Sequence, residues 1–393
     1  MRKHVAVAER YWMMMLFSVR IAERKMSRMK KSNIILFILC CMCFLVLGDA
    51  AQVKAASPNE ETCTVLLGET FSLKIDTKKE VSYYSSNKSV VRVNQKGKAR
   101  ALKKGTATVS ATYGKKTYYW NITVTNKVDV IVFAGQSNMA GQGGLASEAP
   151  ELIQGAGYEC KAVTDPTQIV PITEPFGLGQ DTPLMNDAPY RNGTLVTSFV
   201  NAYYKQTKVP VVGVSVTRVG TTSNQWNESY YTEVISRYKK ACAALKERGI
   251  KVRKKYMVFF QGESDALIGN TAKTYKKNTI SMFDKVQRKT KIEKCFLIRI
   301  GTLQSDKTLF DDVSAMQTKM CKVYKDFVLV STKANALSKK HYQSDGLHIN
   351  QQGLNKIGKE AGTYTGKYAN TGKEPAIKDI KNGNTYKARK IQN

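Results

Sequence analysis

The segment Val128–Gly141 constrains the fold of this chain most, because a buried-strand pattern ends there in a glycine-containing turn. It reads VDVIVFAGQSNMAG, an apolar and largely β-branched run followed by small residues and one hydroxyl, that of Ser137. Runs of this kind are typical of inner strands of parallel sheets, and reactive groups collect at the carboxyl ends of such strands. The segment therefore predicts either a nucleophile at Ser137 or an ordinary strand-to-helix turn with Ser137 as its N-cap.

Two further segments carry polar groups after strand-like runs. Tyr256–Asp265 (YMVFFQGESD) is a second buried-strand pattern that ends in polar residues. Ser344–Asn350 (SDGLHIN) places Asp345 three residues before His348. A serine hydrolase needs a base of near-neutral pKa and a carboxylate that holds the imidazole in one tautomer. An Asp and a His at this spacing can supply both from one loop, although a lone His is more often structural.

GQSNMAG, QGESD and DGLH, in this order and at these separations, resemble the first, third and fifth sequence blocks of the SGNH hydrolase superfamily. The resemblance is closest to its sialate O-acetylesterase-like branch, which includes acetylxylan esterases of carbohydrate esterase family 6, and it extends over residues 127–368. Three ordered motifs make it specific. It implies that Ser137 is the nucleophile, His348 the general base and Asp345 its orienting partner, with no metal or other cofactor.

The resemblance also implies an oxyanion hole. Its donors would be the backbone N–H of Ser137, the N–H of Gly220 in VSVTRVGTTSNQW (Val214–Trp226), and the side-chain amide of Gln261. Such donors are worth about 3 kcal/mol each in the transition state. Glu263 is expected to support the site by bonding loop backbone or positioning the nucleophile turn; a carboxylate that simply begins a helix is the alternative.

Some positions differ from the branch pattern or leave two interpretations open. Phe260 stands where a Trp is common, and Val219 stands where a second Gly is common. Arg218 is expected either to meet an acidic substituent of the substrate or to be an ordinary surface residue. Trp226 is expected either to stack on a sugar or to pack in the interior. His341, seven residues before His348, is the alternative base, but it lacks a carboxylate at the same short spacing.

Residues 127–370 alternate between strand and helix patterns. Apolar runs predict five strands, and amphipathic helices are expected near Tyr230–Arg248, Thr274–Lys289 and Gln351–Tyr368. This order predicts an α/β fold: a three-layer α/β/α sandwich with a mostly parallel five-stranded sheet, as in SGNH hydrolases and flavodoxin. The polar, Pro- and Gly-containing stretch Gln142–Gly193 is expected to be an irregular insertion that shapes the substrate cleft.

The flanking segments have different patterns. Residues 57–126 show short alternating runs with turns about every ten residues, which predicts a small all-β sandwich. Their segment SSNKSVVRVNQKGKARALKKGTATVSAT resembles the bacterial Ig-like group 2 domain. Residues 1–56 contain Lys30 and Lys31 followed by IILFILCCMCFLVLG, which predicts an export signal, with a retained membrane anchor as the alternative. Residues 371–393 are basic and poor in apolar residues, and are expected to be disordered.

The formal net charge of +31 points to an anionic partner. No nucleic-acid-binding motif accompanies the dispersed lysines, so we expect no nucleic-acid partner. Adhesion to an anionic cell wall or to acidic glycans is one interpretation, and a solvated basic surface without a partner is the other. The cysteines outside the apolar run are scattered and form no CxxC motif, so neither a disulfide framework nor a zinc site is indicated.

Together these patterns predict a secreted or cell-surface carbohydrate O-acetylesterase that works through a Ser-His-Asp triad and an acyl-serine intermediate. The alternatives are a lipase or thioesterase of the same superfamily, and a surface adhesin whose hydrolase domain is inactive. The acetylated glycan and the oligomeric state are left open by the sequence.

Overall fold

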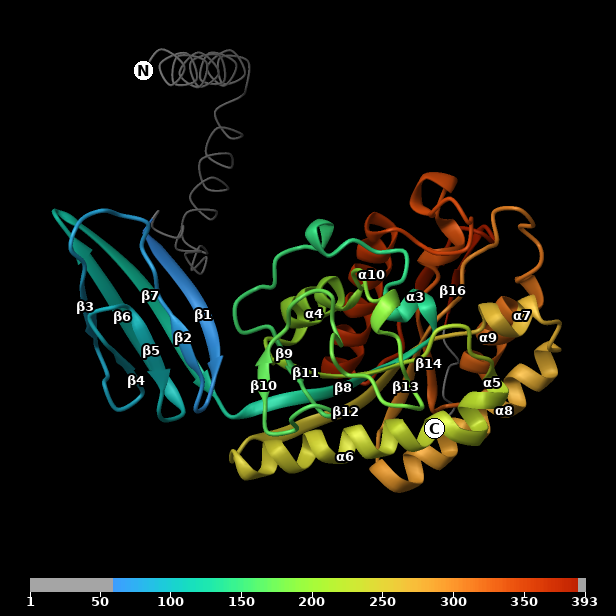
Figure 1. Ribbon diagram of the computed structural model, residues 1–393, viewed down its shortest axis with the longest axis horizontal. Coiled ribbons are helices and arrows are strands. Elements are labelled where there is room, and N and C mark those ends of the chain that lie inside the picture. The colour runs from blue at the N-terminus through green and yellow to red at the C-terminus, as the bar shows by residue number, and fades with distance from the viewer. Residues whose placement is uncertain (1–58, 388–393) are drawn as a thin grey trace, which may run out of the picture. The chain divides into compact units, whose positions relative to one another are not determined.

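The computed structural model describes residues 59–387 (Figure 1). The predicted export signal lies outside them. Within the described range, no helix is both long enough and apolar enough to cross a membrane. The five cysteines in this range, Cys63, Cys160, Cys242, Cys295 and Cys321, are free thiols.

The first described module is a β-sandwich, as the alternating runs predicted. One sheet has the strand order β1-β7-β6-β3 and the other β2-β5-β4. The strands are β1 (Glu60–Leu66), β2 (Thr70–Ser72), β3 (Ser82–Ser85), β4 (Val91–Val93), β5 (Lys98–Ala101), β6 (Gly105–Tyr113) and β7 (Lys116–Thr125). Alternate residues of β6 and β7, including Val109, Trp120 and Ile122, are buried between the sheets. This period-2 burial is what a two-sheet sandwich requires.

The second module is built on a seven-stranded sheet of order β10-β9-β11-β8-β12-β13-β14. Its strands are β8 (Lys127–Gly135), β9 (Gly157–Cys160), β10 (Ile169–Pro171), β11 (Val211–Thr217), β12 (Lys251–Phe260), β13 (Lys294–Ile298) and β14 (Phe327–Ser331). Every pairing is parallel except that of β9 with β10. The strand that leads to Ser137, β8, lies at the centre and is buried after its first residue. The five predicted strands are all present.

The sheet has two strands more than predicted, and both come from the insertion. β9 pairs in parallel with β11, and β10 extends the sheet at its edge. The sequence pattern does not reveal them, because each is only three or four residues long and polar residues surround them. The insertion is therefore partly an extension of the sheet rather than wholly irregular.

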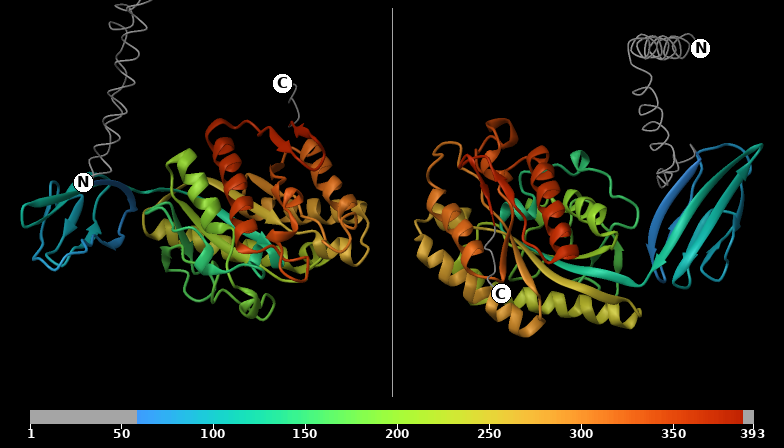
Figure 2. Two further views of the ribbon diagram at one scale, coloured as in Figure 1. Left: turned by 90° about the horizontal axis from the view of Figure 1, so that it is seen from above. Right: turned by 180° about the vertical axis from the view of Figure 1, so that it is seen from behind.

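Helices cover both faces of this sheet (Figure 1, Figure 2). On one face, α4 (Val196–Thr207) packs along α10 (Gln351–Thr371). On the other, α6 (Tyr231–Glu247) lies beside α8 (Ala272–Thr290), and α9 (Asp311–Val323) follows next to α8. The predicted three-layer α/β/α sandwich is confirmed, and the three predicted helices correspond to α6, α8 and α10 within a few residues.

The C-terminal segment differs from the expectation of disorder. After α10, β15 (Ile377–Asp379) and β16 (Asn384–Tyr386) form an antiparallel hairpin, which we call the C-terminal hairpin. Ile377 and Tyr386 are buried. The Asp379 carboxylate accepts two hydrogen bonds, of 2.5 and 2.6 Å, from the buried Arg299 guanidinium at the end of β13.

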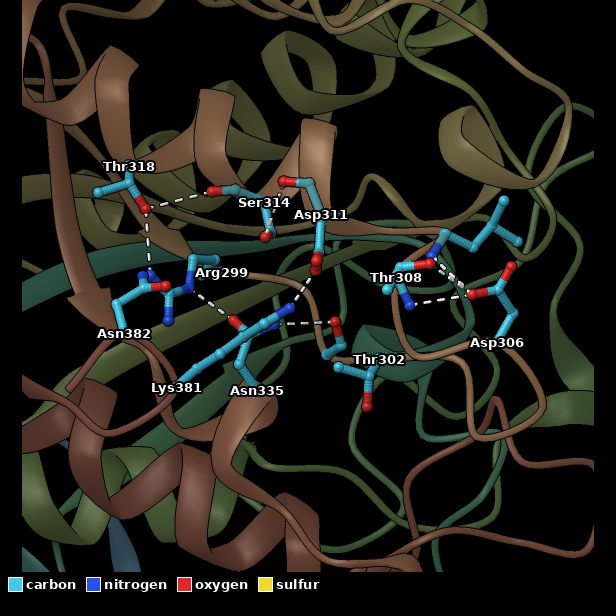
Figure 3. Close-up of polar contacts among 12 residues, drawn as sticks. Arg299, Thr302, Asp306, Thr308, Asp311, Ser314, Thr318, Asn335, Lys381 and Asn382 are labelled. Carbon is cyan, nitrogen blue, oxygen red and sulfur yellow. Dashed lines mark hydrogen bonds and ion pairs between the residues drawn. The ribbon is translucent and has the colours of Figure 1, made fainter.

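Arg299 also donates to Asn335 Oδ1, and Lys381 of the hairpin pairs with Asp311 of α9 (Figure 3). A buried guanidinium without a partner would be costly. The hairpin is therefore held by two long-range ion pairs and by the burial of Ile377 and Tyr386, and composition alone could not have predicted that order.

Candidate active site

The nucleophile turn begins where β8 ends. Gly135 has φ 151°, and a Cβ atom there would lie 2.1 Å from the carbonyl oxygen of Phe260, so only glycine fits. Ser137 follows as the first residue of the short helix α3 (Ser137–Ala140) and is 4% exposed. The structure thus places the Ser137 hydroxyl at the carboxyl end of the central strand, as predicted.

Asp345 and His348 share one loop. The loop leaves the fold at Tyr342 and returns at Ile349, where these two residues form a β-bridge. Asp345 Oδ2 lies 2.6 Å from His348 Nδ1, while Oδ1 accepts the backbone N–H groups of Leu347 (2.8 Å) and His348 (2.9 Å). The predicted pairing of Asp345 with His348 is therefore present.

The electrostatics of this pair suit general-base chemistry. Partial burial opposes ionisation of Asp345, but the hydrogen bonds from the His348 backbone and ring and from Leu347 hold the pKa of Asp345 below its usual range. Asp345 is therefore ionised at neutral pH. It accepts the proton on Nδ1, which leaves Nε2 of a neutral His348 ring as the basic nitrogen.

Asn138 joins the nucleophile turn to this loop. Its side-chain oxygen accepts the backbone N–H of Ile349 at 3.0 Å, and its Nδ2 donates to Glu263 Oε1 at 2.8 Å. Asn138 directly follows Ser137, and Ile349 directly follows His348, so one hydrogen bond links the neighbours of the two reacting residues. Asn138 was not singled out from the sequence, and its place within GQSNMAG was the only signal.

A close backbone approach brings the same two segments together. A Cβ atom at Gly143, just after the nucleophile turn, would lie 2.5 Å from the Ile349 carbonyl oxygen and 3.0 Å from His348 Cβ. In addition, the Gln343 side chain donates to the Gly143 carbonyl oxygen. The segments that carry Ser137 and His348 are therefore in direct contact, although more than 200 residues separate them in the sequence.

Glu263 is buried behind the nucleophile turn. It is the first residue of α7 (Glu263–Leu267), and its carboxylate is 1% exposed. Burial raises the pKa of Glu263, while the hydrogen bond from Asn138 lowers it. Both interpretations of Glu263 therefore describe it: the residue begins a helix, and it also holds Asn138 in place.

Two backbone N–H groups expected in the oxyanion hole are free. Among residues 59–387, the N–H groups of Ser137 and Gly220 donate no hydrogen bond. Gly220 has φ 66°, and nothing lies within 4 Å of the place where its Cβ would be. An unpaired backbone donor is what an oxyanion site needs.

The side-chain amide of Gln261, the third expected donor, is already hydrogen-bonded. Its Nε2 donates to the Thr221 carbonyl oxygen (2.9 Å) and to Asp265 Oδ2 (2.6 Å), and its Oε1 has no partner within the described residues. Both amide hydrogens therefore have acceptors, and Gln261 ties the Gly220 loop to α7. To donate to an oxyanion, Gln261 must release one of these acceptors, and its predicted role stays a prediction.

Comparison with family models decides the family. Residues 64–124 match the bacterial Ig-like domain (group 2). Residues 127–365, more than half of the chain, match the family described as carbohydrate esterase, sialic acid-specific acetylesterase. The chain belongs to this esterase family. It is therefore an ester hydrolase of the carbohydrate acetylesterase type, preceded by an Ig-like domain.

Several solved structures are similar to this esterase. A protein from Arabidopsis thaliana shares 19% identity, with a TM-score of 0.48, over 60% of this chain and 96% of its own. A carbohydrate acetylesterase from Xanthomonas citri shares 12% identity, with a TM-score of 0.41, over 79% and 73%. An acetylxylan esterase from Geobacillus stearothermophilus shares 11% identity, with a TM-score of 0.36, over 59% and 91%. A search of curated proteins finds no match.

The alternative base of the esterase, His341, lies in a different environment. Its Nδ1 is 3.0 Å from Ser338 Oγ, and its Nε2 is 2.6 Å from Lys356 Nζ. Burial and the Lys356 ammonium lower the pKa of His341. Because both ring nitrogens have partners and neither partner is a carboxylate, the geometry favours His348 as the base.

The structure decides between the two interpretations of Trp226 and shows the protein partners of Arg218. Trp226 is fully buried, donates to Thr221 Oγ1 at 2.9 Å and packs on Phe259, so it cannot serve as a sugar-stacking platform. Arg218 is one-third exposed and lies 3.6 Å from Asp187 of the insertion, and it also donates to the Asn186 carbonyl oxygen. Arg218 thus holds the insertion against the end of β11.

Proposed function

We propose that this esterase removes acetyl groups from O-acetylated carbohydrates through an acyl-serine intermediate, with Ser137, His348 and Asp345 as the triad. The observation that carries the proposal is the Asp345–His348 pair, which Asn138 connects to the nucleophile turn. A serine, a base and a carboxylate that orients the base are the groups used for nucleophilic acyl transfer.

In the acylation step, His348 Nε2 accepts the hydroxyl proton of Ser137 as Oγ attacks the acetyl carbonyl carbon. The tetrahedral oxyanion is held by the free N–H groups of Ser137 and Gly220. Asp345 stabilises the imidazolium that forms. When the intermediate collapses, the C–O bond to the sugar breaks and His348 returns the proton to the sugar oxygen, so the deacetylated sugar leaves with a hydroxyl group.

Deacylation repeats these steps with water as the nucleophile. His348 takes a proton from a water molecule, which attacks the acetyl carbonyl carbon, and the proton then goes to Ser137 Oγ as acetate leaves. In our proposal Gln261 contributes its amide N–H as the third oxyanion donor once one of its acceptors, Thr221 or Asp265, moves away. Neither step requires a metal ion or another cofactor.

We further propose that the protein is exported and acts at the cell surface or outside the cell. The lysines before the apolar run of residues 34–48, and the small residues after it, support this proposal. N-terminal sequencing of the protein recovered from washed cells and from the medium tests it. A start within residues 50–57 supports cleavage and export, while intact protein confined to the soluble cell interior contradicts it.

Ser137→Ala tests the central proposal. The variant should lose acetate release from p-nitrophenyl acetate and from acetylated polysaccharides, because no other nucleophile is proposed. Ser314→Ala is the matched control, because Ser314 is a buried serine of α9 outside the site. Wild-type turnover by Ser137→Ala, with contaminating esterases excluded, would contradict the triad. An assay panel of acetylated xylan, pectin, sialic acid and peptidoglycan identifies the substrate.

A further inference from the structure

A cavity of about 610 Å³ lies along the exposed side of α10. Four lysines line it: Lys333, Lys356, Lys359 and Lys367. His341, Tyr364, Glu360, Ser338 and Thr363 are its other polar lining residues. We call this feature the α10 groove. No residue of the proposed triad or oxyanion hole lines it, so it needs an explanation of its own.

The helix period gathers the charges of the α10 groove. Lys356, Lys359 and Lys367 follow one another along α10 at offsets of 3 and 8 residues, which places them on one face of the helix. Tyr364 lies on the same face, and the Lys367 ammonium is 5.4 Å from the centre of its ring. Lys356 and Lys359 are like charges three residues apart, which slightly destabilises the helix, and a bound anion would relieve this repulsion.

The one acid in the α10 groove does not balance these lysines. The Glu360 carboxylate accepts the Ser331 hydroxyl (2.7 Å) and the Thr332 N–H (3.1 Å), and it lies 3.6 Å from Lys333 Nζ. The negative charge of Glu360 therefore offsets the positive charge of Lys333 at most. Among residues 59–387, no carboxylate forms an ion pair with Lys356, Lys359 or Lys367.

Lys356 has a neutral partner instead. Its ammonium donates to Nε2 of the buried His341 ring at 2.6 Å, which fixes the position of the ammonium without cancelling its charge. A fixed and uncompensated cation at the wall of a cavity is a suitable partner for a carboxylate. The side chains of Leu337, Ile380 and Tyr364 supply apolar area between the cations.

We propose that the α10 groove binds a carboxylate-bearing polysaccharide at a site separate from the catalytic centre. The lysines would pair with the carboxylates, while the Tyr364 ring and the aliphatic side chains would pack on the C–H faces of the sugar rings. A purely phosphate-bearing polymer would use the lysines but not the apolar surface. The proposal goes beyond acetyl-ester hydrolysis and does not depend on it.

The position of the α10 groove gives such binding a consequence for the catalytic loop. The His341 carbonyl oxygen accepts the backbone N–H of Asn350 at 2.9 Å, at the point where the loop that carries Asp345 and His348 leaves and rejoins the fold. A polysaccharide held here is therefore anchored at the base of the catalytic loop. Anchoring raises the local concentration of neighbouring acetyl groups without any new contact to the reacting atoms.

The experiment measures binding of full-length protein to polygalacturonate, which has carboxylates and no acetyl groups, at low salt. We expect the double variant Lys359→Gln/Lys367→Gln to bind about fivefold more weakly, because two exposed ion pairs are lost. Lys239→Gln/Lys240→Gln on α6 is the matched control: it removes the same charge from exposed positions on the opposite face of the sheet, and its affinity should stay near that of the wild type.

Fully methyl-esterified polygalacturonate, which keeps the backbone but loses the charge, should not bind. Equal losses of affinity in both double variants would overturn the proposal, because they would indicate diffuse attraction to a basic protein. Tighter binding of inorganic polyphosphate through the same two lysines would also overturn it in favour of a phosphate polymer. Turnover of p-nitrophenyl acetate, measured in parallel, should be unchanged in both variants and shows that they are folded.

Discussion

Asn138→Ala is predicted to lower turnover by misplacing the base relative to the nucleophile. The substitution removes the acceptor for the Ile349 N–H (3.0 Å) and the donor to Glu263 (2.8 Å), and it leaves two buried groups without partners. Each such group costs about 1–3 kcal/mol, so the free energy of unfolding should fall by about 2–6 kcal/mol. The lower end applies if Glu263 takes up a proton, which its raised pKa favours.

The catalytic effect of Asn138→Ala should be larger than its effect on substrate binding. Displacement of a catalytic group by about 1 Å costs about 100-fold in rate, so kcat for p-nitrophenyl acetate should fall by that factor with little change in KM. The assay pairs steady-state kinetics with urea unfolding, so that lost activity can be separated from lost folded protein.

Glu263→Gln is the informative companion variant. A glutamine keeps an acceptor for Asn138 but carries no charge, so kcat should stay within about threefold of the wild type if Glu263 acts only by holding Asn138. Wild-type kcat in a destabilised but folded Asn138→Ala protein would refute the positioning argument. A large loss of kcat in Glu263→Gln would show that the negative charge itself assists His348.

Three other predictions follow from the geometry. Gln261→Ala should lower kcat by about 100-fold if the amide turns toward the oxyanion. If the variant instead loses stability while kcat of the folded fraction is unchanged, the role of Gln261 is structural only. His348→Asn should abolish activity and His341→Asn should retain most of it. The reverse pattern of initial rates would identify His341 as the general base. Arg299→Met leaves Asp379 buried and should cost about 3–5 kcal/mol in urea unfolding at pH 7. Burial opposes ionisation of Asp379, but the hydrogen bonds from Arg299 and Asn382 prevail and lower its pKa. The contribution of the ion pair to the free energy of unfolding should therefore be full above about pH 5 and should shrink as the pH falls through that lowered pKa. A difference between wild type and Arg299→Met that does not change with pH would contradict this prediction.

The parts of the fold that follow from local pattern were predictable. Residues 130–134, which lead to Ser137, are all apolar because β8 is buried on both faces, and such a run is typical of an inner strand. Asp345 and His348 were predictable as a pair because three residues of one loop suffice to bring them together. In these places the sequence neighbours are also the spatial neighbours.

The unpredicted parts depend on partners distant in the sequence. β9 is too short to show a period, and it becomes a strand because β11 offers it a free edge. Asn138 gains its role from Ile349 and Glu263, which lie more than 100 residues away. The hydrogen bond of Gln261 to Thr221 likewise joins residues that are 40 positions apart. No single-sequence pattern encodes such contacts.

The C-terminal hairpin has a consequence for the order in which the molecule is completed during synthesis. Residues 377–386 leave the ribosome after every strand of the seven-stranded sheet. Within residues 59–387, they supply the only carboxylate that pairs with the buried Arg299. Until they emerge, Arg299 lacks this carboxylate partner. A chain that stops short of this hairpin lacks that ion pair and should be a preferred target for quality-control proteases.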